Sequence, residues 1–184
     1  EDYCIDRATK LFNLEKVSRS PAKFDLKKLN NINAKKLNSM KTSDIYKLVI
    51  DRFKLSLNNE EQKRFKSLLP ELLKRVQIYT DLEFEFDWLF QKDFFCKDKN
   101  YQLKLQKHNL MLKEIGSRLK ECEWSVENIK NTLNQYILDK SLTFKDIGPL
   151  LRMALTGKTN SPDLVSIIYE LGCTITVNRL NYKY

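Results

Sequence analysis

Apolar residues recur every three or four positions along nearly the whole chain, which is the spacing of one face of an α-helix. Glycine is rare, with four in 184 residues, and no long run of β-branched residues occurs. Strands would need alternating or β-branched segments. The pattern therefore predicts an all-α fold built from consecutive helices.

Capping signals divide this pattern into separate helices. We expect helices near 3–12, after Asp25, after Thr42 or Ser43, after Asn58 and Asn59, over 82–90, 101–121 and 126–138, and behind a Thr143–Asp146 capping box. Ser125 is the expected cap of the helix over 126–138. Pro70 is expected to stop one helix and start another, and residues 91–100 are typical of a loop.

The segment 82–90 fits a strand or a helix, and we favour a helix because no partner strand is visible. An aromatic cluster begins here. At helical spacing such residues favour core packing over base stacking. The cluster contains Phe84, Phe86, Trp88, Phe90, Phe94 and Phe95.

Residues 150–172 place turn-forming residues between two apolar helical runs, and this segment is called the corner below. Gly157 is positioned to end the first helix in a left-handed conformation. Ser161 is expected to cap the second helix, with Pro162 at its first position and Gly172 at its end. A helix–turn–helix explains all four residues.

Three residues at the corner are not needed for that turn. Arg152 stands one helical turn before it, and Thr156 and Thr159 carry hydroxyl groups that a turn can expose. The corner therefore offers polar groups to a ligand.

The net charge is +9, from 33 basic and 24 acidic residues. An excess of this size favours a polyanion such as RNA, DNA or an anionic membrane. The alternative is ordinary surface lysine in a chain rich in Lys and Asn. No apolar run reaches the about 18 residues that a membrane span needs, and residues 1–17 do not resemble a signal peptide.

The cysteines and the histidine argue against metal and nucleophilic chemistry. Cys4, Cys96, Cys122 and Cys173 lie far apart without a C-x-x-C pair, and His108 is the only histidine. A zinc ribbon or a Cys–His dyad needs closer or more numerous partners. We expect reduced, buried thiols.

The corner sequence "RMALTGKTNSPDLVSIIYELG" resembles the C-terminal anticodon-binding region of bacterial-type glutamyl-tRNA synthetases. Family members carry R-x-A-L-T-G-x-x-x-[ST]-P-x-L, followed by a helix ending in Leu-Gly. The matching residues are Arg152, Ala154, Leu155, Thr156, Gly157, Ser161, Pro162, Leu164, Leu171 and Gly172.

A second segment, "LEKVSRSPAKFDLKKLNNINAKKL", resembles the family stretch just before those domains, with Asn31 in place of the usual Trp. Trp124 also falls where the family has a Trp that opens a helix. The two segments stand in the family's order and at its separation. The resemblance thus spans nearly the whole chain.

The resemblance implies a helical bundle or cage of two consecutive anticodon-binding subdomains, at 42–97 and 98–184. Residues 1–41 would be the end of a stem-contact helical region. The family's H-x-G-H and K-[LM]-S-K signatures and a Gly-rich phosphate loop are missing here. A chain without them should not activate glutamate by itself.

The resemblance also implies the site residues. Arg152 and Arg75 would read anticodon bases, with Ser161, Pro162, Leu164 and Thr156 around them. Arginine suits this role because its planar fork gives paired donors. Contacts to the tRNA backbone are expected from Lys27, Lys28, Lys35, Lys36 and Lys158.

The parent would be a glutamate–tRNA ligase, with ATP and Mg in its catalytic domain and no cofactor in this part. Its partner would be tRNA(Glu), with tRNA(Gln) as a second candidate, and no membrane. The parent is expected to be a monomer in a bacterial cytoplasm. The alternative is a helical protein- or RNA-binding module without tRNA specificity.

Overall fold

A computed structural model describes residues 4–17, 23–91 and 94–183. These residues form α-helices and short 3-10 helices, and no strand occurs among them, as the all-α prediction requires. The α-helices are α1 (Ile5–Leu11), α2 (Leu26–Ser39), α3 (Thr42–Phe53), α4 (Asn59–Leu73), α5 (Leu82–Phe86), α6 (Lys99–Lys107), α7 (Asn109–Glu121), α8 (Val126–Asp139), α9 (Phe144–Thr156) and α10 (Leu164–Leu180). The 3-10 helices are η1 (Leu14–Lys16), η2 (Tyr79–Asp81) and η3 (Asp87–Leu89).

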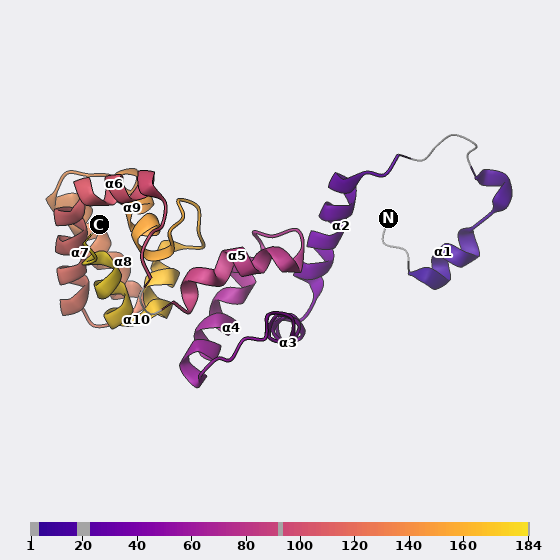
Figure 1. Cartoon of the computed structure of the whole chain (residues 1–184), viewed down its shortest axis with the longest axis horizontal. Coiled ribbons are helices and arrows are strands. Elements are labelled where there is room, and N and C mark those ends of the chain that lie inside the picture. The colour runs from indigo at the N-terminus through magenta and orange to yellow at the C-terminus, as the bar shows by residue number, and fades with distance from the viewer. Residues whose placement is uncertain (1–3, 18–22, 92–93, 184) are drawn as a thin grey trace.

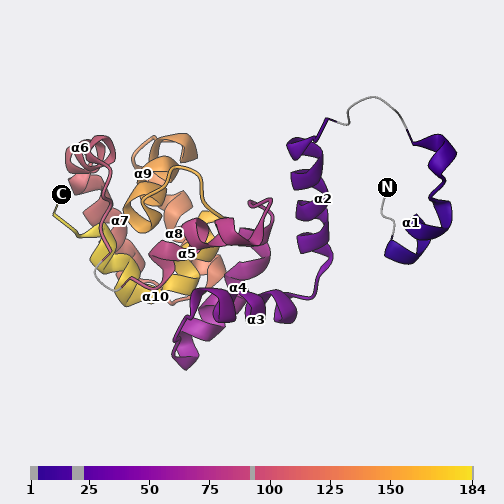
Figure 2. The same ribbon diagram turned by 45° about the vertical axis from the view of Figure 1, so that its right-hand side comes forward.

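The helices follow one another along an elongated molecule (Figures 1 and 2). Helices α6 to α10 form a bundle at one end, and α3, α4 and α5 form a smaller group beside it. Helix α2 contacts α4, and the Asn33 amide donates at 2.7 Å to the carbonyl of Gln77, in the segment after α4. Helix α1 has no buried residue and lies apart from the others in both views.

One hydrophobic core serves both expected subdomains. It runs without a break from Ile45 of α3 to Leu180 of α10. The expected boundaries coincide with helix starts, since α3 begins at Thr42 and α6 at Lys99. The two groups of helices are therefore joined by apolar packing, and the division into 42–97 and 98–184 stays a prediction.

Most capping predictions are confirmed. Asp25 and Ser125 each accept a hydrogen bond from the backbone N–H three residues on. Asn58 forms a reciprocal capping box with Glu61. The Asp146 carboxylate accepts from the backbone N–H of Thr143 at 2.7 Å. The prediction for α3 is wrong, because Lys41 occupies the cap position and Thr42 is already helical.

Pro70 does not restart the chain, contrary to the sequence prediction. It lies inside the continuous helix α4, exposed on the outer side. Its neighbours Leu68, Leu69 and Leu72 are buried in the core. Tertiary packing of this apolar face holds the helix together where the missing N–H would otherwise interrupt it.

The single long helix expected over 101–121 is also wrong, because the chain breaks at His108. This residue leaves helical geometry at φ −106° and ψ 17°, between α6 and α7. Helix α6 packs on α9, whereas α7 packs on α8 and α10. A straight helix would not reach both sets of partners, so the break satisfies the two packing faces.

Helix, not strand, is confirmed for residues 82–90, as α5 followed by η3. The aromatic residues serve mainly as core. Phe86, Trp88 and Phe94 are buried, whereas Phe84 keeps 68% of its surface exposed. Phe86 meets Phe65 edge to face, with ring centroids 5.1 Å apart, a favoured aromatic geometry.

All four cysteines are free thiols, and only Cys96 is buried. The prediction of buried thiols is thus wrong for Cys4, which is exposed, and for the half-buried Cys122 and Cys173. No helix among the described residues is long and apolar enough to cross a membrane. Over the same ranges, no three His, Cys, Asp or Glu side chains gather where they would hold a metal ion.

Arg179 is a buried cation that ties the two groups of helices together. Its guanidinium donates to the carbonyls of Trp88 and Gln91, each at 2.8 Å, and to the carbonyl of Leu155. It also lies over the Phe94 ring, 4.5 Å from the centroid. Three carbonyls, in η3, in the loop after it and near the end of α9, therefore depend on one side chain.

A second tie joins α4 to α10. The Arg64 Nε donates to the Glu170 carbonyl at 2.6 Å, and the Ser67 hydroxyl donates to the Glu170 carboxylate at 2.5 Å. Both acceptors lie just before Gly172, where a φ of 79° interrupts helical geometry inside α10. Gly172 was expected to close the helix, but a second helical segment follows it at once.

Replacing Gly157 by alanine should destabilise the fold by about 1–2 kcal/mol. Its φ is +70°, a left-handed conformation that costs side-chain-bearing residues about that much. An added Cβ would also stand 3.1 Å from the Phe94 ring. Urea unfolding measures the change, with G116A as control, because Cβ at Gly116 meets its nearest atom at 3.5 Å. Equal stability of the two variants would contradict the prediction.

The Tyr136 phenol should ionise well above the ordinary tyrosine pKa of about 10. Burial, together with a hydrogen bond from its hydroxyl to the Glu114 carboxylate at 2.8 Å, raises the pKa of Tyr136 to about 12. The neutral phenol therefore stabilises the fold below the ordinary pKa of about 10, and this contribution is lost as the pH rises towards 12.

An ultraviolet titration of phenolate absorbance tests this. Y136F should remove the step near pH 12. A Y136F titration that still shows this step would refute the assignment.

Candidate nucleic-acid interface

The corner between α9 and α10 is built around the side chain of Arg152. Gly157 ends α9 in the left-handed conformation, as expected, and the chain then runs back past the helix. The Arg152 Nη1 donates to the Ser161 carbonyl at 3.0 Å, to the Ser161 hydroxyl at 2.6 Å and to the Pro162 carbonyl. The arginine thus fixes the shape of the loop that follows its own helix.

Ser161 and Pro162 do not start the second helix, contrary to the sequence prediction. Asp163 is the cap, and its carboxylate accepts from the Ser166 N–H at 2.9 Å. The Ser161 hydroxyl is engaged by Arg152 instead, so it is not available to cap a helix. The Asp163 carboxylate thus satisfies one of the backbone N–H groups at the start of α10.

Part of the Arg152 guanidinium is left for a partner. The side chain is half-buried, and all its hydrogen bonds to described residues come from Nη1. Among those residues no carboxylate lies within ion-pair distance of it. Burial lowers the pKa of Arg152; nearby Asp163 opposes this shift and Arg75 adds to it. The Arg152 guanidinium therefore lies near a second cation, Arg75, and forms no ion pair with a described carboxylate.

Thr156, Pro162 and Leu164 are buried, together with Ser161. The Thr156 hydroxyl donates to the Arg152 carbonyl at 2.8 Å and accepts from the Lys158 N–H at 3.3 Å. The expectation of an exposed hydroxyl is wrong for Thr156, because the turn itself uses it. These four residues support the corner from inside, beneath Arg152 and Lys158.

Arg75 comes to the same place from the other group of helices. It lies just beyond the end of α4, and its Nε donates to Glu85 of α5 at 2.9 Å. The other oxygen of Glu85 faces the Lys158 ammonium at 3.6 Å. We call Arg75, Glu85, Arg152 and Lys158 the corner cluster; it unites three predicted site residues with one carboxylate.

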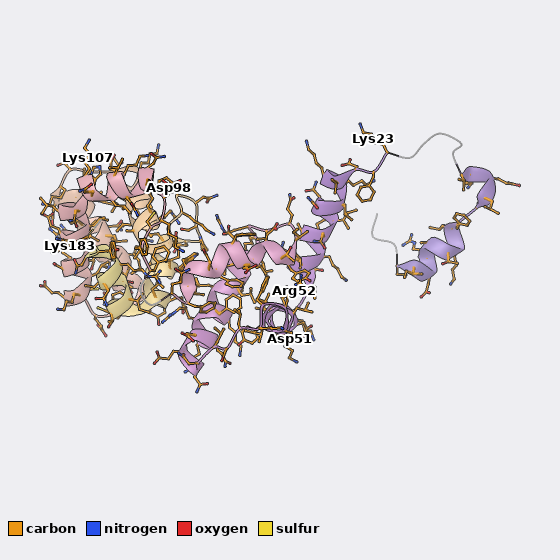
Figure 3. All side chains as sticks on the ribbon, viewed as in Figure 1. Lys23, Asp51, Arg52, Asp98, Lys107 and Lys183 are labelled. Atoms are coloured by element: carbon orange, nitrogen blue, oxygen red, sulfur yellow. The ribbon has the colours of Figure 1, made fainter. Side chains whose placement is uncertain are left out.

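The four predicted lysines of the first segment lie elsewhere. Lys27, Lys28, Lys35 and Lys36 are all exposed on α2, which both ribbon views place away from α9. In Figure 3, Lys23 lies just before the first residue of this helix, and Arg52, Lys107 and Lys183 mark other parts of the surface. Positive charge is therefore spread widely over the surface. The corner cluster differs because several charged side chains from both groups of helices meet there.

Two charged residues of this region were missed by sequence reasoning. Glu85 carries no local signal, because its partners Arg75 and Lys158 meet it only in the fold. Asp163 had one: it directly precedes the apolar run of α10 and stands three residues before Ser166, as an N-cap residue should.

Comparison with known proteins gives a family match. The family model described as an anticodon binding domain matches residues 25–183 of this chain. Glutamate–tRNA ligase 1 of Bartonella henselae is 29% identical over 181 residues, which are 92% of this chain and 38% of that protein. Glutamate–tRNA ligase 2 of Parvibaculum lavamentivorans is 27% identical and is matched over 98% of this chain and 38% of its own length.

A solved structure has the same fold. The crystal structure of a glutamate tRNA ligase from Elizabethkingia meningosepticum, in complex with its amino acid, aligns with a TM-score of 0.76 at 21% identity. The alignment covers 96% of this chain and 35% of that one. The chain thus spans little more than a third of the length of the proteins it matches.

Proposed function

The chain belongs to the anticodon binding domain family, and from this premise we propose that it is the tRNA-binding, anticodon-recognising C-terminal portion of a glutamate–tRNA ligase. The carrying observation is the convergence of Arg75, Arg152 and Lys158, from both groups of helices, at one corner. Arginine forks suit unpaired base edges, and a nearby lysine suits phosphate. The family match favours this function over a helical module without tRNA specificity.

Within this proposal the site residues divide into two roles. Arg75 and Arg152 face the bases, and Lys158 faces the backbone beside them. Ser161, Pro162, Leu164 and Thr156 hold the corner in shape from inside. The exposed lysines of α2 contact the tRNA stem, at a distance from the corner.

The partner is tRNA(Glu), with tRNA(Gln) as a second substrate of a parent that charges both. The parent works as a monomer in the bacterial cytoplasm, and ATP and Mg belong to its catalytic portion. The residues of this chain do not fit either group. The four glycines stand singly, and no acidic or histidine cluster suited to a metal occurs among the described residues.

Binding of whole tRNAs tests the proposal. Filter binding at a fixed salt concentration should show that the chain prefers tRNA(Glu) to a non-cognate tRNA. Its affinity should fall as salt rises, because phosphate contacts release counterions. Equal affinity for both tRNAs would leave only non-specific attraction by the net charge of +9. The same chain should show no glutamate-dependent exchange of pyrophosphate into ATP.

A further inference from the structure

Glu85 is the one carboxylate that the described residues place inside the corner cluster. Its two oxygens contact different cations, Arg75 Nε at 2.9 Å and Lys158 Nζ at 3.6 Å. The side chains are 19%, 21% and 28% exposed for Arg75, Glu85 and Lys158. The contact with Lys158 crosses between the two groups of helices, and both contacts are partly shielded from solvent.

The contact with Arg75 sets the direction of its guanidinium. Glu85 engages Nε, and no described residue accepts a hydrogen bond from Nη1 or Nη2. Those two terminal nitrogens form the end of the planar fork. Glu85 therefore leaves the end of the fork open while fixing the plane in which it lies.

The negative charge of Glu85 also disfavours one class of ligand group. A phosphate placed on Arg75 would lie close to this carboxylate and be repelled at a poorly solvated site. The neutral edge of a base suffers no such repulsion and accepts hydrogen bonds from the fork. Without Glu85, the Arg75 fork would attract any RNA backbone phosphate.

We propose that Glu85 determines specificity at the corner: it positions Arg75 through Nε, keeps phosphates off Arg75, and so reserves the arginine fork for a base edge. This inference rests on the proposed function, since it concerns the same RNA site. Glu85 acts through Arg75 and is therefore a positioning residue.

Fluorescence anisotropy with anticodon stem-loop RNAs tests the proposal. The probes are the tRNA(Glu) stem-loop and three versions with one anticodon base changed in each, over a range of salt concentrations. E85Q should bind all four RNAs more tightly and steepen the slope of log K against log salt by about 1. Its preference for the unchanged triplet should fall about tenfold at the position that Arg75 reads.

The matched control is E83Q, which makes the same charge change on the same helix, where Glu83 is exposed. E83Q should keep the preference and the salt slope of the wild type. Because Glu85 acts through Arg75, adding E85Q to an R75A variant should lower the preference no further. Circular dichroism of each variant confirms that the helices are intact.

Two results would overturn the role of Glu85. One is an E85Q variant with the preference and salt slope of the wild type. The other is an E85Q variant that binds all four RNAs more weakly by one common factor, as a purely structural role predicts. A wild-type chain that binds all four RNAs equally would instead overturn the proposed function itself.

Discussion

Replacing Arg152 by alanine should weaken binding of the tRNA(Glu) anticodon stem-loop by about 1–3 kcal/mol, or about 5- to 150-fold in Kd. Two effects act together. The variant loses the guanidinium nitrogens that are left for a base, and it releases Ser161 and Pro162, which Nη1 holds in place. Isothermal titration measures the change.

Two further variants separate charge from geometry. R52A removes the same charge from an exposed position on α3 and should cost much less. R152K keeps the charge but lacks the planar fork, so it should retain the salt dependence of the wild type and lose most of its base preference. If R152A and R52A weakened binding equally, Arg152 would count only as one more positive charge.

Replacing Arg179 by methionine should lower the free energy of unfolding by about 3–5 kcal/mol, the range seen when one partner of a buried charged interaction is removed. Arg179 is 2% exposed. Methionine fills similar space but leaves the carbonyls of Leu155, Trp88 and Gln91 without their donor, and each such buried acceptor costs about 1–3 kcal/mol.

Urea denaturation followed by circular dichroism measures this loss. R52M is the control, because it makes the same substitution on an exposed helix surface and should change stability by about 0.5 kcal/mol or less. R179K should recover only part of the loss, since one ammonium group does not reach three carbonyls on separate segments. A change below about 1 kcal/mol for R179M would contradict the role given to this arginine.

The parts of the fold that were predictable from sequence depend on neighbours within a few positions. Asp25, Asn58 and Ser125 cap helices because each side chain bonds to a backbone group two or three residues on, which a sequence displays directly. Failures arose where a distant partner decided the outcome. Pro70 stays helical because of core packing, and Ser161 leaves its expected capping role because Arg152 engages its hydroxyl.

The candidate site shows the same limit. Arg152 and Arg75 were identified through family resemblance, and only the fold shows that they share one corner. Glu85 and Arg179 carry no motif at all. Glu85 contacts Lys158, and Arg179 donates to the Trp88 carbonyl, and both partners are far away in the sequence. Such pairings follow from helix packing, which periodicity alone does not specify.

The continuous core has a consequence for exchanging parts between relatives. A chimaera joined at residue 98 would bring a donor's corner onto a foreign α4 and η3, where Arg64 and the Trp88 carbonyl meet Glu170 and Arg179. The donor's Arg152 and Lys158 would arrive without the Arg75 and Glu85 that they meet at the corner. Transfer of anticodon recognition between relatives therefore requires exchanging α3 to α10 together.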